Sequence, residues 1–289
     1  DNVTLLDIHS YSKEDLLGTA ACQTVIGDIS NQSDVDHVFR EGGFDSVFHL
    51  AAILSAEAEG DVGHAWNVNM EGTRNVLEAA VRFRVKRVIF TSTVASFGAG
   101  VPDTVKVDAP QWPQSFYGVS KVAGERLGIY FSHRYGLDFR CVRLPAVMAP
   151  HGAGGGASAY CSQLYVDSVQ NESYEFYISP TTGTAVIYID DAVRALVGLH
   201  DAEDSQLQRR EYQVHGVSPC AEEMAAAVLE KLPDVKIVYN PDPVRDEIVQ
   251  SWPFRLDDTD AANDWGWRAE LDLTAMTARM LAALRVECS

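Results

Sequence analysis

The sequence predicts an α/β fold, a doubly wound parallel sheet with helices on both faces. Strand-like apolar runs alternate with helix-like stretches through the first half of the chain, and this alternation is typical of parallel strands joined by helices. Small and polar residues follow several of the expected strands, at the carboxyl ends where such sheets bind ligands. The 289 residues, 46% hydrophobic and 22% charged, have an ordinary globular composition.

The first half of the chain supplies the strands and two long helices of a Rossmann-like sheet. The expected strands are residues 3–7, 24–26, 46–52, 87–91 and 139–144, which are short and rich in apolar or β-branched residues. Apolar residues at helical spacing predict long helices at about 62–83 and 117–135. Residues 1–150 are therefore expected to form the main part of the molecule.

The second half is less regular. A glycine-rich loop at 151–158 is followed by an expected helix at about 190–200, a strand at 212–214 and a helix at 221–231. We expect residues 151–289 to form mostly a smaller α/β lobe that folds over the sheet.

The charge and the apolar runs exclude some kinds of partner. A net charge of −18 argues against nucleic acid or an anionic membrane as a partner. The longest apolar stretches are strand-length or are interrupted by charges, so no transmembrane helix is expected. No secretory signal is visible at the start, and we expect a cytoplasmic protein.

Cysteines and acidic pairs give no sign of a metal site. The five cysteines are scattered and form no C-x-x-C pair, so we expect neither a disulfide framework nor bound zinc. They are Cys22, Cys141, Cys161, Cys220 and Cys288. Asp190 and Asp191 are expected to cap the following helix, and Asp257 and Asp258 to start another. No His or Cys joins either pair at ligand spacing, so no metal is expected.

Tyr117 and Lys121 are the candidate acid/base pair. Their spacing of four places both on one face of the second long helix. A phenol has a pKa near 10, and a nearby ammonium lowers it toward the range useful for proton transfer. Thr93, at the end of an expected strand, can hydrogen-bond a substrate oxygen beside the Tyr. The alternatives are a chance pair on a surface helix and, for Thr93, a strand-end cap.

Further motifs complete a recognisable series. In chain order they are Asp7, Gly27-Asp28-Ile29, His49-Leu50-Ala51-Ala52, Asn67-Val68-Asn69, Thr91-Ser92-Thr93, Tyr117 to Lys121 and Arg143-Leu144-Pro145. This series resembles the extended short-chain dehydrogenases/reductases, the NAD-dependent epimerase/dehydratase family, over nearly all of the first half. The resemblance implies that Tyr117 is the general acid/base, that Lys121 lowers its pKa and holds the nicotinamide ribose, and that Thr93 orients the substrate.

The same resemblance implies NAD as the cofactor and residues 1–150 as the dinucleotide-binding portion. Asp7 would bind the adenosine ribose, and Asp28 and Ile29 the adenine. An acid at Asp7 favours NAD over NADP, because it would repel a 2′-phosphate. The other implied cofactor contacts are Leu50, Ala51, Ala52, Asn69, Tyr117, Lys121 and Pro145. The resemblance also implies a homodimer through the helices near 62–83 and 117–135. His49, which follows an expected strand, is expected to have a structural role lining the cofactor groove.

Longer strings resemble the short-chain type of L-threonine 3-dehydrogenases. They include Leu54-Ser55-Ala56, Tyr117 to Glu125, Pro241 to Arg245, Ser251-Trp252-Pro253 and Asp264 to Trp267. The resemblance implies that Ser55, the loop residues Gly155, Gly156 and Ser158, and Trp252 surround a small amino acid together with Thr93 and Tyr117. The alternatives are a helix cap for Ser55 and a core aromatic for Trp252.

The chain departs from that pattern at three loop positions and at its front. Ala157, Ser158 and Ala159 stand where the pattern has two Thr and an Asp, and a site built on hydrogen bonds is sensitive to such losses. The sequence also begins at what reads as the second strand of such a sheet, without the glycine-rich turn that approaches a pyrophosphate. Two explanations stay open: the printed chain is part of a longer protein, or its cofactor binding is impaired.

Three functions are compatible with these residues. The first is NAD-dependent oxidation of the 3-hydroxyl of a small β-hydroxy amino acid, with L-threonine giving 2-amino-3-oxobutanoate. The second is a cofactor-independent lyase, aldolase or epimerase that uses Tyr117 on a related amino acid. The third is a non-catalytic scaffold, against which the intact Thr93, Tyr117 and Lys121 argue.

Overall fold

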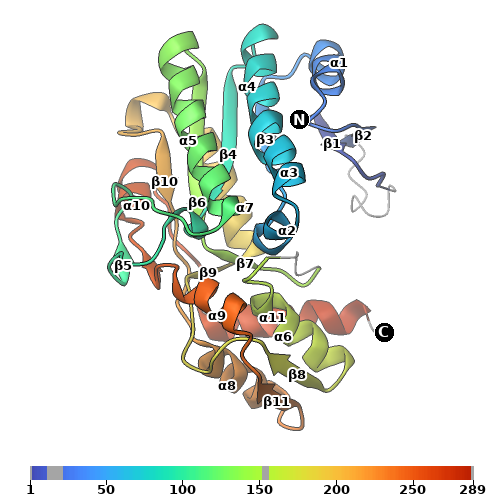
Figure 1. Cartoon of the computed structure of the whole chain (residues 1–289), viewed down its shortest axis with the longest axis vertical. Helices are drawn as coiled ribbons and strands as arrows, with labels where there is room; N and C mark the ends of the chain where they lie inside the picture. The colour runs from blue at the N-terminus through green and yellow to red at the C-terminus, as the bar shows by residue number, and fades with distance from the viewer. Residues whose placement is uncertain (1, 12–21, 152–155, 288–289) are drawn as a thin grey trace.

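The computed structural model describes residues 2–11, 22–151 and 156–287, arranged as Figure 1 shows. The strands are β1 (Val3–Asp7), β2 (Cys22–Ile26), β3 (Ser46–His49), β4 (Arg87–Thr93), β5 (Thr104–Val105), β6 (Asp138–Leu144), β7 (Ala146–Met148), β8 (Ser173–Phe176), β9 (Val186–Tyr188), β10 (Glu211–Gln213), β11 (Lys236–Tyr239) and β12 (Arg255–Leu256). The α-helices are α1 (Gln32–Gly42), α2 (Ser55–Gly60), α3 (Val62–Ala65), α4 (Thr73–Arg82), α5 (Phe116–Tyr135), α6 (Tyr160–Gln170), α7 (Ile189–Asp201), α8 (Ala221–Lys231), α9 (Pro243–Gln250), α10 (Thr259–Trp265) and α11 (Leu273–Glu287). A π-helical segment, η1 (Trp66–Gly72), joins α3 to α4, and two 3-10 turns are η2 (Val94–Ser96) and η3 (Asp204–Gln206).

A four-stranded sheet forms the centre of the molecule, in the order β10-β6-β4-β3. Strand β4 pairs with β6 from Arg87 opposite Asp138 to Thr93 opposite Leu144. Strands β1 and β2 pair with each other in a separate two-stranded sheet. Every pairing between the named strands is parallel, as the alternation of strands and helices predicts.

Helices cover both faces of this sheet, which confirms the doubly wound class. On one face α4 and α5 pack against the strands, and Leu77, Phe90 and Phe139 are buried between them. On the other face α7 packs on β4 and β6, and Ala195 and Tyr212 belong to that core. The buried apolar residues on both sides of the sheet stabilise the fold.

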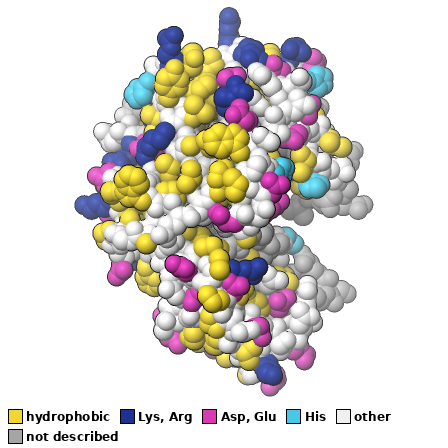
Figure 2. Space-filling model, viewed as in Figure 1, with side chains coloured by type: hydrophobic (Ala, Val, Ile, Leu, Met, Phe, Trp, Pro, Cys, Tyr) yellow, Lys and Arg dark blue, Asp and Glu magenta, His cyan; other side chains and the backbone are white. Residues whose placement is uncertain are grey.

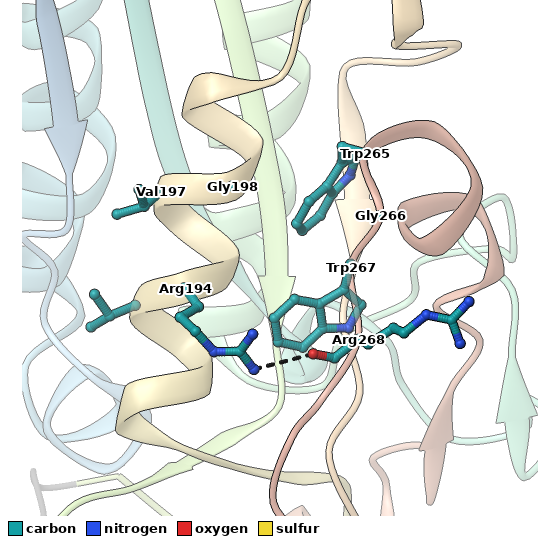
Figure 3. A pocket seen from close by; sticks show the side chains of 8 residues that line it. Arg194, Val197, Gly198, Trp265, Gly266, Trp267 and Arg268 are labelled. Atoms are coloured by element: carbon teal, nitrogen blue, oxygen red, sulfur yellow. Dashed lines mark hydrogen bonds between the residues drawn. The ribbon is translucent and has the colours of Figure 1, made fainter.

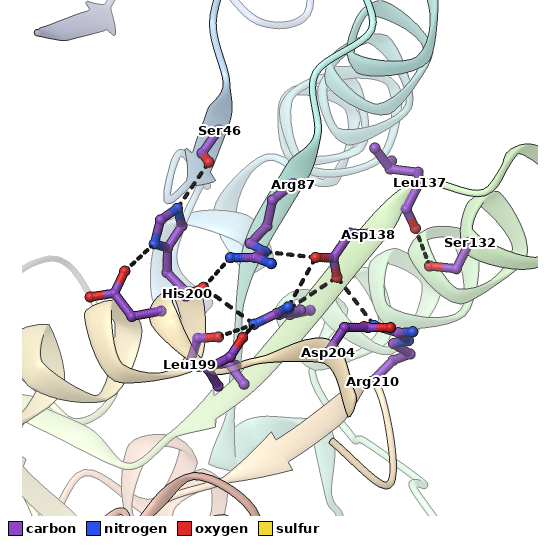
Figure 4. Close-up of polar contacts among 12 residues, drawn as sticks. Ser46, Arg87, Ser132, Leu137, Asp138, Leu199, His200, Asp204 and Arg210 are labelled. Atoms are coloured by element: carbon purple, nitrogen blue, oxygen red, sulfur yellow. Dashed lines mark hydrogen bonds and ion pairs between the residues drawn. The ribbon is translucent and has the colours of Figure 1, made fainter. Parts of the chain in front are cut away.

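The end of α7 is fixed to the sheet by two arginines, Arg140 and Arg87 (Figure 4). Arg140 is fully buried and donates to the carbonyls of Leu199 and Ala202 at 2.7 and 2.6 Å, while its other nitrogens contact Asp138. Arg87 also donates to Asp138, at 2.7 Å, and to the carbonyl of His200. Cations at this position satisfy the last carbonyls of the helix and complement its dipole.

The lower lobe in Figure 1 is built from the second half of the chain. Two small parallel pairs, β7-β9 and β8-β11, lie there with α6, α8, α9 and α11 around an apolar core. Strand β12 returns to pair with β5, which places Leu256 opposite Val105. Strand β10 pairs with β6 in the central sheet, and α7 packs on that sheet. The second half of the chain therefore contributes to both parts of the molecule.

Most expected elements are present, and the differences have local causes. The long helix expected at 62–83 contains a π-helical turn, in which the Thr73 hydroxyl donates to the carbonyl of Asn69. The strand expected at 46–52 ends at His49. None of the helices in the described ranges is long and apolar enough to cross a membrane.

The capping role expected for Asp190 and Asp191 is wrong. Helix α7 begins at Ile189, so both acids lie inside its first turn, where they complement the helix dipole. Asp191 accepts from the backbone amides of Glu270 and Leu271, while Asp190 pairs with Arg279. Asp257 and Asp258 were expected to start a helix, and they lie at the start of α10. Asp258 is the residue before that helix, and Asp257 accepts from the amide of Thr259.

Candidate active site

Tyr117 lies in the first turn of α5, next to the end of β4. The hydroxyl of Ser115 caps this helix by accepting from the amide of Gly118 at 3.2 Å. A Cβ atom added at Gly118 would lie 2.2 Å from the carbonyl oxygen of Ala95, so only glycine lets the helix approach η2 this closely. The close approach brings Tyr117 beside Thr93, whose hydroxyl acts to lower the pKa of the phenol.

Lys121 lies one turn later and is almost completely buried, with 4% of its surface exposed. Its Nζ donates to the carbonyl oxygen of Thr91 at 2.8 Å. The same nitrogen is 4.8 Å from the ring centre of Phe90 and 5.7 Å from that of Tyr117. Burial lowers the pKa of Lys121 to about 8, against the opposing effects of Cys141 and Glu125.

The pKa of Tyr117 differs from the expectation. Burial raises it to about 12, and the hydrogen bond from Thr93 offsets only part of that increase. Lys121 was expected to lower the pKa of Tyr117, but it is not among the causes of the shift. Its ammonium donates to the carbonyl of Thr91 rather than to the phenol, and the effect of burial dominates. In this state the phenol is neutral near pH 7, and Lys121 is mostly protonated.

A buried ion pair lies directly behind these two residues. Both Glu125 and Arg143 have no exposed surface, and they form two hydrogen bonds at 2.9 and 2.8 Å. The hydroxyl of Ser92, which precedes Thr93, donates to Glu125 at 2.5 Å. Burial raises the pKa of Glu125, but its contacts with Arg143 outweigh this effect and hold the pKa below its usual value. No local pattern in the sequence marks this pair as part of the site, although both residues stand in its motifs.

The residues expected at the adenosine end lie at the ends of β1 and β2. The carboxylate of Asp7 accepts from the amide of His9 at 2.9 Å and from the hydroxyl of Tyr11 at 3.1 Å. Asp28 follows β2 and accepts from the amide of Ser30 at 2.8 Å.

Ile29 has a different environment from the polar members of this group. Only 8% of its surface is exposed, and it packs in the core beneath the site. Its side chain lies against Gly72, where an added Cβ would be 2.7 Å from the Cδ1 atom of Ile29.

The expected groove residues divide into open and buried positions. Leu50, which is 55% exposed, and Ala51 leave an open apolar surface after β3, and Ala52 is half-buried. Asn69 is buried. Its side-chain amide donates to the carbonyl of Ile53 and accepts from the backbone N–H of Ile53, which fixes the segment after β3. Pro145 is buried between β6 and β7.

The structure brings three expected substrate residues together. The hydroxyl of Ser55 accepts from the amide of Ala157 at 3.0 Å, so it does not cap α2, whose preceding residue is Leu54. A Cβ at Gly156 would lie 3.5 Å from that hydroxyl and 3.8 Å from the hydroxyl of Ser158. Gly155 lies outside the described residues.

Trp252 follows α9 and is 8% exposed in the core of the lobe. Its packing agrees with the alternative of a core aromatic. Sequence reasoning missed Tyr177, whose hydroxyl contacts two backbone groups of the segment 156–160. A tyrosine between Phe176 and Ile178 carries no signal of such a role in the sequence.

His49 has the structural role expected of it. It is 4% exposed, and its Nε2 lies 2.9 Å from the hydroxyl oxygen of Thr73. Burial, followed by the charge of Lys121, lowers its pKa to about 3, so it stays neutral. In the described ranges, no group of three or more His, Cys, Asp and Glu side chains is placed to hold a metal ion.

An open pocket of about 410 Å³ lies elsewhere, between α7 and the turn after α10 (Figure 3). Its lining includes Arg194, Val197, Trp265 and Trp267. Arg194 donates to the carbonyl of Arg268 at 3.1 Å and lies over the ring of Trp267. None of the expected catalytic or ligand-binding residues lines this pocket, so it is separate from the candidate active site.

Comparison with known proteins agrees with this geometry. Residues 2–214 match the model of the NAD dependent epimerase/dehydratase family. Mitochondrial L-threonine 3-dehydrogenase of Bos taurus is 36% identical over 283 residues, which are 97% of this chain and 75% of the bovine protein.

Solved structures are similar over almost the whole chain. The holo form of a GalE-like L-threonine dehydrogenase from Cupriavidus necator is 32% identical, with a TM-score of 0.92 over 98% of this chain and 91% of that one. A monomeric L-threonine 3-dehydrogenase from a metagenome, in its apo form, is 30% identical, with a TM-score of 0.92 over 99% and 91%.

Proposed function

We propose, from the premise that this chain belongs to the NAD dependent epimerase/dehydratase family, that it oxidises the 3-hydroxyl of L-threonine to give 2-amino-3-oxobutanoate. The observation that carries the proposal is that the fold brings Thr93, Tyr117 and the buried Lys121 together in a chain whose relatives are named as threonine dehydrogenases. The names of these relatives do not favour the alternative function, a cofactor-independent lyase, aldolase or epimerase.

The residues at the end of β4 and the start of α5 divide the chemistry between them. NAD, when bound, supplies the hydride acceptor for the hydrogen on C3 of the substrate. In its deprotonated form, Tyr117 would accept the proton of the 3-hydroxyl as the carbonyl forms, and Thr93 would hold the substrate oxygen beside the phenol. The ammonium of Lys121 lies 5.7 Å from the ring of Tyr117 and donates to the carbonyl of Thr91 in this state, so its proposed contribution is to hold the nicotinamide ribose.

The described residues suit two parts of NAD. The carboxylate of Asp7, at the carboxyl end of β1, has an acceptor character that matches the hydroxyls of a ribose and disfavours a 2′-phosphate. Exposed Leu50 and Ala51 offer an apolar surface at the carboxyl end of β3. Lys121 would hold the second ribose, and Asp28 and Asn69 would line the groove between them.

The amino acid would lie between the two parts of the molecule. We assign its contacts to Ser55, Gly156, Ser158, Thr93 and Tyr117. Residues 1–150 would carry the cofactor and the acid/base pair, and residues 151–289 mostly the substrate lobe. The role of Trp252 would be to keep water away from the reacting carbon.

Two further proposals concern the assembly and its location. Several large apolar side chains are exposed on α3, η1 and α5, and Figure 2 shows hydrophobic side chains on this face of the molecule. They are Val62, Trp66, Val119, Tyr130 and Tyr135. We propose that two copies pair through this face.

We also propose a cytoplasmic location, which fits the free thiols of Cys22, Cys141, Cys161 and Cys220.

The first test measures the thermal midpoint with and without NAD, then the absorbance of reduced nicotinamide after L-threonine is added. A ligand that binds only the folded protein raises the midpoint. We expect such a rise, followed by threonine-dependent absorbance. Tyr117→Phe should keep the NAD-induced rise but lose about 10²–10⁴-fold in rate, the usual contribution of a general base.

Two outcomes would contradict the proposal. One is a folded protein whose midpoint NAD does not raise, and the other is a Tyr117→Phe variant that oxidises threonine at the original rate. Serine and other 3-hydroxy amino acids, tested in parallel, show how Ala157 and Ala159 affect the choice of substrate.

A further inference from the structure

The segment 156–160 is held from both parts of the molecule. On one side, the hydroxyl of Ser55 in α2 accepts from the amide of Ala157 at 3.0 Å. On the other, the hydroxyl of Tyr177 donates to the carbonyl of Ala157 at 3.0 Å and accepts from the amide of Tyr160 at 2.9 Å. Ala157 is 2% exposed, so water does not replace these partners while the segment stays in place. The Tyr177 hydroxyl thus connects the two ends of one turn.

The ring of Tyr177 is itself fixed in position. The guanidinium carbon of Arg245 lies 4.8 Å from its centre, within the range of a cation–π contact. The ring of Tyr160 meets it edge-on, with centres 6.1 Å apart and planes at 84°. Burial raises the pKa of Tyr177 to about 12, so its hydroxyl keeps the proton that it donates to Ala157.

The helix that carries Arg245 is joined to the segment just after β8 that carries Tyr177. The amide of Asp242, the residue before α9, donates to the carbonyl of Tyr177 at 2.9 Å. The carboxylate of Asp246, one residue after Arg245, accepts from the amide and the hydroxyl of Ser179 and from the hydroxyl of Thr182, at 3.0, 2.5 and 2.6 Å. These bonds leave α9 little freedom to move relative to Tyr177.

We propose that Tyr177, held by Arg245, is a positioning residue that fixes the segment 156–160 against Ser55 and so shapes the amino-acid site. The proposal rests on the proposed function, because Ser55, Gly156 and Ser158 are assigned there to the substrate. It also gives a role to the string Pro241 to Arg245, which the acid/base chemistry does not use.

The substitution Tyr177→Phe tests the role of the hydroxyl. It removes two hydrogen bonds, keeps the ring under Arg245 and leaves the carbonyl of Ala157 and the amide of Tyr160 without this partner. We expect the KM for L-threonine to rise about tenfold, since small displacements of positioning groups have effects of this size or larger. The KM for NAD and the pH profile of kcat should stay unchanged, because Tyr117 and Lys121 are not displaced.

Tyr239→Phe is the matched control. Tyr239 lies in the same lobe and stacks on Phe176 at 5.1 Å, without a contact to the segment 156–160 among the described interactions. Its loss of one hydroxyl should leave both KM values unchanged. Arg245→Lys should retain most of the affinity for threonine, since a cation remains over the ring, whereas Arg245→Met should raise the KM as Tyr177→Phe does.

Hydrogen exchange gives a readout that does not depend on activity. Peptides covering 156–160 should exchange faster in Tyr177→Phe than in the original protein and in Tyr239→Phe, because the amide of Tyr160 loses its acceptor. Unchanged exchange together with an unchanged threonine KM would overturn the proposal. Faster exchange in a protein that never oxidises threonine would support the positioning role while rejecting the proposed substrate.

Discussion

The buried ammonium of Lys121 lowers the stability of the folded protein. Its pKa is about 8 in the folded protein, against an ordinary value of 10.5, because burial disfavours the charged form. A shift of this size corresponds to about 3 kcal/mol of differential interaction. Between pH 8 and 10.5 the unfolded chain binds this proton more tightly than the folded chain, so stability contributed by Lys121 rises with pH in that window.

We therefore predict that Lys121→Met raises the free energy of unfolding at pH 7 while it removes activity. The gain should be about 1–3 kcal/mol, since loss of the hydrogen bond to Thr91 offsets part of the relief. It should be largest below pH 8 and disappear above about pH 10.5. Urea unfolding across this pH range measures the effect.

Lys86→Met is the control for this prediction. Lys86 is exposed and pairs with Asp45 at 2.6 Å, so its replacement should not show that pH dependence. The prediction would be wrong if Lys121→Met were less stable than the original protein at pH 7 and the loss were the same at pH 10.5.

At the scale of elements, the position of α5 depends on contacts behind its catalytic face. Glu125 and Arg143 join α5 to β6, and the hydroxyl of Ser92 adds β4 to the same group. Arg143 also donates to the carbonyl of Val107, which attaches the segment before α5. These bonds hold the start of α5 and the end of β4 in one arrangement.

Glu125→Gln should cost about 3–5 kcal/mol, because it leaves the cation of Arg143 buried without its partner. The double variant Glu125→Gln with Arg143→Met should recover part of this loss, since it removes the unpaired charge. Denaturant unfolding of Glu125→Gln, of Arg143→Met and of the double variant gives the comparison. If the double variant is less stable by the sum of the two single effects, the residues do not act as a pair.

The sequence predicts these elements well where local signals agree. The pattern of apolar residues gives β1, β4, β6 and α5 to within two residues, because burial on one or both faces produces a strong periodicity. It does not reveal the π-helical turn in 66–72, which depends on side-chain bonds such as that of Thr73. It also misplaces Asp190 and Asp191, whose partners Arg279 and Glu270 are distant in sequence.

At the scale of the whole molecule, the exposed apolar face of α3, η1 and α5 leads to a prediction about assembly. Trp66 is 47% exposed and Tyr130 is 52% exposed, and burial of such side chains stabilises an interface. We expect light scattering to give the mass of a dimer for the original protein. Trp66→Glu should shift the population toward the monomer, because it places a charge in the interface.

Trp112→Glu is the matched control, because Trp112 is 76% exposed and lies between β5 and α5, outside the helices of this face. It should leave the mass unchanged. A monomeric original protein at micromolar concentration would contradict the dimer, and would agree with the solved relative that is described as monomeric.

The sequence by itself determined the class of sheet, the long helix α5 and the placement of Tyr117 and Lys121 on one face of it. These follow from periodicity and from a spacing of four on one helix, and both are properties of neighbouring residues. Only the tertiary structure decided that burial raises the pKa of Tyr117, that Glu125 and Arg143 form a buried pair, and that Tyr177 holds the segment 156–160. The physical reason is that desolvation and these hydrogen bonds depend on which distant segments the fold brings together, and a single sequence does not encode that in any local pattern.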